Sequence, residues 1–156
     1  MSPTSIPPLV LSSHDRDRLE PLARRALAEG HPVGCFLLTE LRRAKICAPE
    51  ELPRDAVRLD NWVSYRADWG WPVESRMLVC PDDYSNRDAQ LSVLSPVGAA
   101  LIGLRTRSRM PYLGIEGFRH IATAESLDPP LGIMSLLYLP ADDDDDEDDD
   151  PGPAAA

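Results

Sequence analysis

The chain has 156 residues, enough for one ordinary domain and a small appendage, and its formal net charge is −10. Nine of the negative charges lie in the acidic run 142–150, so the rest of the chain carries about −1, which argues against a basic nucleic-acid-binding surface. The three cysteines are an odd number without paired spacing, which argues against a disulfide framework and favours a reducing compartment. Neither a signal-peptide pattern nor a run of about 20 apolar residues is evident. We therefore expect a cytoplasmic protein without a membrane span.

The N-terminal third predicts two helices. Residues 1–10 are rich in proline and serine, and we expect them to form a flexible N-terminus. Ser12 followed by Asp15 resembles a capping box at the start of a first helix, and a second apolar stripe follows over residues 35–46. The stripe of the first helix consists of Leu19, Leu22, Ala26 and Leu27. A Gly- and Pro-containing turn joins the two helices, so residues 11–47 predict an antiparallel helical hairpin.

Residues 48–130 change to the alternating pattern of half-buried strands. The segment 62–80 predicts a β-hairpin, and a third strand over residues 89–95 leads directly into a short helix. Two further strands flank the turn 114–117, and Pro111 marks the first of them as an edge or bulged strand. The predicted fold class is therefore α+β, with a helical hairpin followed by about five antiparallel strands and one short helix.

Three segments of this second part resemble the Rnk proteins, regulators of nucleoside diphosphate kinase that are related to the GreA and GreB transcript-cleavage factors. The segments are residues 46–66, 74–83 and 90–105, and the resemblance extends from about residue 11 to residue 130. It implies an FKBP-like fold for residues 48–130. It also implies RNA polymerase as the partner, at the secondary-channel rim. We expect no cofactor and, because the folded part is nearly neutral, no direct contact to nucleic acid.

The run "SPVGAALIGL" is the most specific part of the resemblance. Ser95 suits a helix N-cap, Pro96 suits the first helical position, and Gly103 can end the helix in the left-handed region. In the Gre relatives the Ser-Pro pair belongs to the docking surface, so the resemblance implies that Ser95, Pro96 and Val97 contact polymerase. A rigid helix start with unsatisfied N–H groups could receive polar partner groups. The alternative is a structural corner that only leads into a core helix.

The turn between the two helices indicates whether the protein could stimulate transcript cleavage. Transcript-cleavage factors carry acidic groups at the hairpin tip that help to hold Mg²⁺, because this ion prefers carboxylate oxygens. Here the tip, Glu29, Gly30 and His31, offers one carboxylate, and the helices are several turns shorter than in those factors. We therefore expect no cleavage activity and no catalytic residues. The alternative interpretation is an ordinary solvated turn.

Two regions depart from the family pattern. Arg105, Arg107 and Arg109 alternate along the approach to the fourth strand, as a solvated edge or as a partner-facing basic patch. Residues 131–141 form an apolar extension that could add a strand or cover a core face. Residues 142–156 predict a disordered acidic tail, either solubilising, or mimicking nucleic acid, or leading the protein to basic surfaces, or folding back on the arginines.

The sequence supports an enzymatic function less well than a regulatory one. The alternative function is an FKBP-like peptidyl-prolyl isomerase or chaperone-like domain, but an aromatic-lined pocket is not evident in a chain with 6% aromatic residues. Trp62, Trp69 and Trp71 are grouped on the first β-hairpin and suit core and turn positions. The histidines and cysteines show no metal-ligand spacing, so we predict no metal site. We also expect a monomeric protein.

Overall fold

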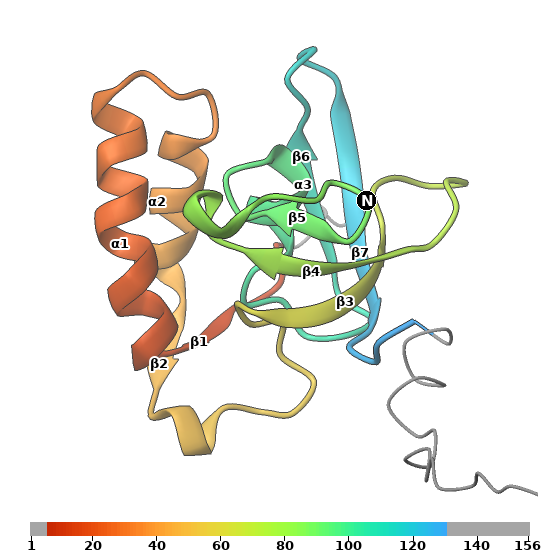
Figure 1. Ribbon diagram of the computed structural model, residues 1–156, viewed down its shortest axis with the longest axis horizontal. Coiled ribbons are helices and arrows are strands. Elements are labelled where there is room, and N and C mark those ends of the chain that lie inside the picture. Colours follow the sequence, from red (N-terminus) through yellow and green to blue (C-terminus); the bar gives the residue numbers. More distant parts are fainter. Residues whose placement is uncertain (1–5, 131–156) are drawn as a thin grey trace, which may run out of the picture.

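The structure is a computed structural model and describes residues 6–130 (Figure 1). Its elements in chain order are β1 (Val10–Ser12), α1 (Ser13–Ala28), α2 (Gly34–Arg43), β2 (Lys45–Cys47), η1 (Pro49–Glu51), β3 (Asn61–Arg66), β4 (Glu74–Val79), η2 (Pro81–Asp83), β5 (Gln90–Ser92), α3 (Pro96–Leu101), β6 (Arg109–Leu113) and β7 (Arg119–Ser126). The helical pair stands beside the sheet, and α3 lies between them (Figure 1). The predicted α+β class, with a helical hairpin before a five-stranded sheet, is confirmed.

The hairpin forms because each helix has an apolar face and a defined end. Ser12 caps α1, its Oγ accepting a hydrogen bond from the Asp15 N–H at 3.1 Å, as the capping-box pattern predicts. Leu19 and Ala23 of α1 are fully buried where α1 packs on α2. The second helix ends at Arg43, before the predicted residue 46. The chain leaves the helix there to enter β2.

A short parallel pair of strands closes the base of the hairpin and was not expected from the sequence. Strands β1 and β2 pair in parallel, and the Lys45 N–H donates to the Leu9 carbonyl at 2.9 Å. Leu9 is 4% exposed and belongs to the core. The ordered fold therefore begins before Leu11, which corrects the expectation that the whole segment 1–10 is flexible.

The main sheet is mixed, with the strand order β5-β4-β3-β7-β6. Neighbouring strands are antiparallel except for β4 and β5, which are parallel, with Met77 opposite Gln90. The all-antiparallel prediction is therefore wrong for β5, because the connection through η2 carries the chain back to run beside β4 in the same direction. Strand β6 lies at the edge, as Pro111 indicates.

The core lies between the hairpin, α3 and one face of the sheet. Alternation along β3 buries Val63 and Tyr65, as predicted for a half-buried strand. Helix α3 packs on β6, β7 and α2. Fully buried side chains from all of these elements form one cluster, including Leu37, Val63, Leu78, Leu101, Met110 and Ala122.

Two polar contacts fix the hairpin to the body of the protein. The buried Asp15 carboxylate accepts a hydrogen bond from the Leu59 N–H at 3.1 Å, and Arg18 forms an ion pair with Asp60 at 2.7 Å.

Within residues 6–130, no helix has the length and apolar character needed to cross a membrane. The apolar extension 131–141 and the acidic tail 142–156 lie outside the described residues.

Candidate docking surface

The start of α3 has the capped geometry that its sequence predicts. Ser95 Oγ accepts a hydrogen bond from the Gly98 N–H at 3.0 Å and donates one to the Ser92 carbonyl at 2.6 Å. The side chain thus ties the first turn of the helix to the end of β5. Ser95, Pro96 and Val97 are all half-buried, so each keeps part of its surface reachable from outside.

Close packing beneath this turn makes it stiff. A Cβ added at Gly98 would overlap the Ser92 carbonyl oxygen, so only glycine fits at this position. At the other end of the helix, Gly103 has φ +79°, the left-handed value predicted for a helix-ending glycine. The six-residue helix is therefore held at both ends by backbone geometry.

The expectation of unsatisfied N–H groups at this helix start is only partly met. Pro96 has no N–H, the Gly98 N–H donates to Ser95 Oγ, and the Ala99 N–H donates to the Ser95 carbonyl at 2.9 Å. Most donors of the first turn are therefore used within the chain. What this turn offers to a partner is chiefly the apolar surface of Pro96 and Val97.

Pro96 also lines a large apolar groove of about 910 Å³ between α2 and the β6–β7 hairpin. Phe36 of α2 forms one wall, while Pro111, Leu113 and Ile121 form the other. The groove and the start of α3 are thus one continuous surface. No sequence pattern indicated it, because its two walls come from parts of the chain about 75 residues apart.

The tip of the helical hairpin is an exposed turn. Gly30 has φ +75°, which reverses the chain after α1, and the Val33 N–H donates to His31 Nδ1 at 3.1 Å. Glu29, Gly30 and His31 are all exposed, with Glu29 supplying the one carboxylate of the turn. Across residues 6–130, no group of three or more His, Cys, Asp or Glu side chains could hold a metal ion.

The three arginines after α3 do not lie together on one strand face. Arg105 forms an ion pair with Asp55 at 2.7 Å, and Arg109 stacks on Trp69 with its guanidinium carbon 4.2 Å from the ring centre. Arg107 has φ +73°, and β6 begins only at Arg109, so Arg105 and Arg107 precede the strand. All three side chains are exposed, so a solvated edge and a partner-facing basic patch both remain predictions.

A histidine between two carboxylates ties the β3–β4 loop to the β6–β7 turn. His120 Nδ1 lies 2.8 Å from Asp68 Oδ2, and Nε2 lies 2.5 Å from Glu116 Oε1. The His120 ring also stacks on Tyr112, whose hydroxyl donates to the Ala67 carbonyl at 2.7 Å. This His120 cluster was not predicted, because Asp68 lies 52 residues before His120 in the chain and no local spacing connects the two.

Charge and burial shift the pKa values of this cluster. The Glu116 and Asp68 carboxylates raise the pKa of His120, and His120 in turn lowers the pKa of both carboxyl groups. Burial, together with the charges of Asp68 and Glu116, raises the pKa of Tyr112 to about 12. The cluster therefore favours a protonated imidazole between two ionised acids.

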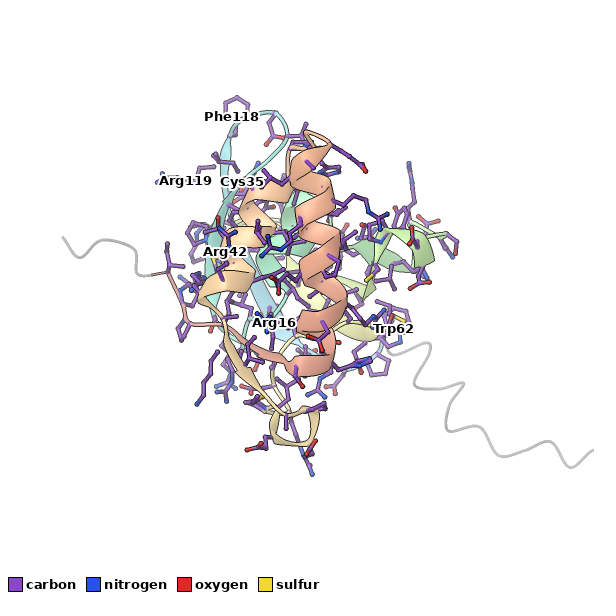
Figure 2. The ribbon with its side chains drawn as sticks, turned by 90° about the vertical axis from the view of Figure 1, so that its left-hand side faces the viewer. Arg16, Cys35, Arg42, Trp62, Phe118 and Arg119 are labelled. Atoms are coloured by element: carbon purple, nitrogen blue, oxygen red, sulfur yellow. The ribbon has the colours of Figure 1, made fainter. Side chains whose placement is uncertain are left out.

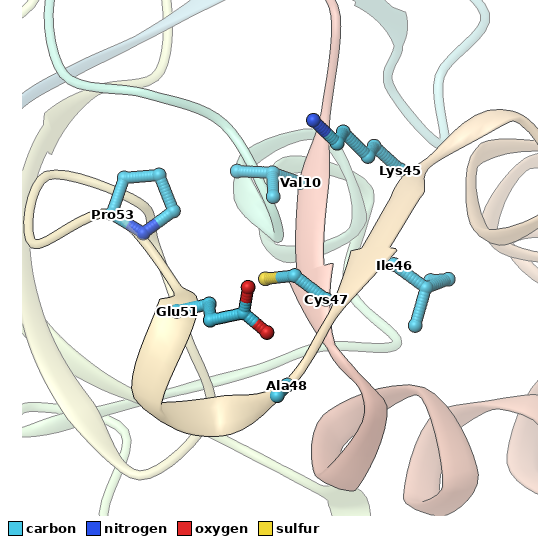
Figure 3. Close-up of a pocket in the computed structure, with 7 residues that line it drawn as sticks. All are labelled: Val10, Lys45, Ile46, Cys47, Ala48, Glu51 and Pro53. Atoms are coloured by element: carbon cyan, nitrogen blue, oxygen red, sulfur yellow. The ribbon is translucent and has the colours of Figure 1, made fainter.

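A smaller hollow of about 470 Å³ lies beside β2, lined by Lys45, Cys47 and Glu51 among others (Figure 3). The Cys47 thiol donates to the Leu11 carbonyl at 3.7 Å, and its sulfur points into the hollow on the side of the Glu51 carboxylate (Figure 3).

Comparison with known proteins assigns the chain to a family. Residues 7–46 match a family model described as the Rnk N-terminus. The regulator of nucleoside diphosphate kinase from Escherichia coli strain K12 is 39% identical over 101 residues, which cover 65% of this chain and 74% of that protein. The chain belongs to the Rnk family. The Rnk regulator from Shigella flexneri matches it to the same extent.

The solved structure of the GreA/GreB transcription elongation factor from Nitrosomonas europaea superimposes on this Rnk-family chain with a TM-score of 0.60. The two are 29% identical, and the alignment covers 77% of this chain and 97% of that structure. The fold is therefore that of the Gre factors, and the resemblance seen in the sequence is confirmed. These similarities identify a transcription-factor-like regulator of the Rnk type.

Proposed function

We propose that this Rnk-family protein binds RNA polymerase at the rim of the secondary channel and occupies that site without stimulating transcript cleavage. The observation that carries the proposal is the stiff, reachable start of α3 on a Gre-like fold. In the Gre relatives the corresponding Ser-Pro pair belongs to the docking surface. A turn that is already rigid loses little conformational entropy when it docks.

The three residues of this start take different roles in the proposal. Pro96 and Val97 contact polymerase through their exposed apolar surface. Ser95 acts through them, because its hydroxyl is already bonded to the Gly98 N–H and the Ser92 carbonyl and so fixes the shape of the turn. Ser95 is therefore a positioning residue rather than a contact of its own.

The helical hairpin supports the absence of cleavage. Helix α1 has 16 residues and α2 has 10, which correspond to about 24 Å and 15 Å at about 1.5 Å per residue. The tip carries one carboxylate, Glu29, whereas holding Mg²⁺ in an active site requires two or more oxygen ligands that converge. Such an arm can fill the mouth of a channel but cannot serve as a metal clamp.

Binding to core polymerase at low salt tests the docking surface. We expect Pro96→Ala to weaken binding about tenfold and Val97→Glu to weaken it further, because both changes alter the centre of the contact. Pro81→Ala is the matched control, since Pro81 also begins a short helix, η2, in another part of the chain. The proposal fails if the folded wild-type protein does not bind, or if Pro81→Ala weakens binding as much as Pro96→Ala.

Competition with a cleavage factor tests the second half of the proposal. Added to stalled elongation complexes, the protein should not release short RNA by itself. It should reduce the cleavage that a Gre factor stimulates, and Pro96→Ala should do so less effectively. Cleavage stimulated by this protein alone would contradict the role assigned to the arm.

A further inference from the structure

The tip of the β6–β7 hairpin carries an unusual amount of exposed apolar surface. Leu113, Ile115 and Phe118 are 63%, 76% and 69% exposed, more than any other large hydrophobic side chain of residues 6–130. Figure 2 shows Phe118 at the end of this projection, with Arg119 and Cys35 of α2 below it. Apolar side chains concentrated in this way mark an interaction surface.

The apolar groove lies directly beside this tip. One of its walls is β6 with the start of β7, and the opposite wall is α2, which contributes Phe36 and the exposed residues Cys35 and Thr39. Leu113 belongs both to the tip and to the groove. A protruding apolar element and an apolar hollow therefore occupy adjacent positions on one face of the molecule.

The free edge of β6 is unsuited to pairing with another strand. The Gly114 N–H donates to the Phe118 carbonyl, so in the antiparallel β6–β7 ladder Tyr112 and Met110 also bond toward β7. Pro111 falls between them and directs its missing N–H position to the free edge. A partner at this face must therefore dock through side chains rather than by extending the sheet.

We propose that the occupant of the groove is a second copy of this chain, with the β6–β7 tip of each copy seated in the groove of the other. Because tip and groove are neighbours on one face, a single two-fold rotation makes both contacts at once. The charges agree with this placement. The Glu116 carboxylate of the tip pairs with His120 of its own chain but stays about half exposed, and the exposed Arg119 lines the groove that the other tip would enter.

The dimer has a consequence for the proposed polymerase contact. Pro96 lines the same groove, so a copy seated there would cover it. Self-association and docking through the start of α3 would then exclude each other. This consequence rests on the proposed function, whereas the dimer itself does not, and it replaces the monomer expected from the sequence.

Sedimentation velocity of the full chain over a wide concentration range tests the dimer. The wild type should shift from monomer to dimer as its concentration rises. The double variant Ile115→Ser/Phe118→Ser and the groove variant Thr39→Arg should each weaken the dimer about tenfold or more, because they alter the two halves of the same contact. Tyr84→Ser is the control, since Tyr84 is an exposed aromatic residue of another segment, and it should leave the dimer unchanged. Circular dichroism verifies that each variant is folded.

A charge exchange tests the two-fold arrangement. Glu116→Arg and Arg119→Glu should each weaken the dimer, and the protein carrying both changes should regain most of the loss. Because Glu116 also pairs with His120 of its own chain, His120→Gln is the control for that contact and should weaken the dimer far less. A wild type that stays monomeric, a dimer indifferent to the tip or groove variants, or a double exchange without recovery would each overturn the proposal. Polymerase binding by the tip variant is measured separately: it should persist, so that failure of the dimer and failure of the polymerase contact remain distinguishable.

Discussion

The start of α3 and the tip of the helical arm are both short turns proposed to meet polymerase, but the fold holds them in different ways. At the start of α3, Ser95 is bonded on two sides and Gly98 is pressed against the Ser92 backbone. At the arm tip, nothing lies within 4 Å of the position where Gly30 would carry a Cβ, and the neighbouring side chains are exposed. One turn is built into the core, and the other projects from it.

This difference matches the two tasks assigned to the turns. A docking surface has to keep one shape, because every degree of freedom that is frozen on binding weakens the complex. An arm that only fills a channel mouth needs length and bulk, and its tip tolerates change. Substitutions should therefore have large effects at the start of α3 and small ones at the arm tip.

The sharpest comparison applies the same substitution to both turns. Gly98→Ala should lower the free energy of unfolding by about 3 kcal/mol, because its new Cβ overlaps the Ser92 carbonyl oxygen and the backbone must move. Gly30→Ala should cost about 1 kcal/mol, which reflects only the strain of φ +75° in open space. Urea denaturation of both variants measures the two values. Equal losses would show that the turns are held alike.

The base of the arm should be more sensitive than its tip. Asp15→Ala leaves the buried Leu59 N–H without its acceptor, and we expect a loss of about 2 kcal/mol. Asp15→Asn should lose less, because its amide oxygen still accepts that hydrogen bond while the cost of burying a charge disappears; burial raises the pKa of Asp15, which reflects that cost. Asp17→Ala, an exposed acid in the same turn, should change stability by less than about 0.5 kcal/mol. A large effect of Asp17→Ala would show that the Asp15–Leu59 hydrogen bond is not what holds the base of the arm.

Loss of the α3 cap should lower stability less than Gly98→Ala or Asp15→Ala does. Ser95→Ala removes the acceptor for the Gly98 N–H and should cost about 1 kcal/mol. Ser95→Thr keeps both the acceptor for the Gly98 N–H and the donor to the Ser92 carbonyl, and it should retain most of the stability. Thermal unfolding compares the two variants. If Ser95→Ala were as stable as the wild type, the hydroxyl would not be what holds this turn.

Local patterns were enough to predict both caps and the course of the best strands. Three predicted features depend only on neighbouring residues, and the structure contains all of them: the Ser12–Asp15 cap, the Ser95–Pro96 helix start and the left-handed Gly103. The alternation that buries Val63 and Tyr65 is equally local. In each case neighbouring residues alone determine the conformation, so the sequence reveals it.

Features that depend on distant partners were missed or predicted wrongly. The helix expected to reach residue 46 ends at Arg43, because β2 pairs with β1 more than 30 residues earlier in the chain. The direction of β5 depends on the route of its connection, and the groove depends on how α2 faces β6. The residues next to a strand or a groove do not determine which distant segment pairs with that strand or forms the opposite wall of that groove.

The His120 cluster holds the β6–β7 turn by a contact that the arm tip lacks, and its strength should depend on pH. Glu116 and Asp68 raise the pKa of His120, so its contribution to stability is complete below its unfolded value of about 6.5 and is lost as pH rises through the folded pKa. The two carboxyl groups have lowered pKa values, so their contribution is lost as pH falls through those values.

The cluster is therefore strongest at mildly acidic pH, between these limits. His120→Gln should lower the melting temperature more at about pH 6 than at alkaline pH, because the imidazole loses its charge as the pH rises through the folded pKa. A difference between wild type and His120→Gln that does not vary with pH would mean that ring stacking on Tyr112, rather than charge, holds this turn.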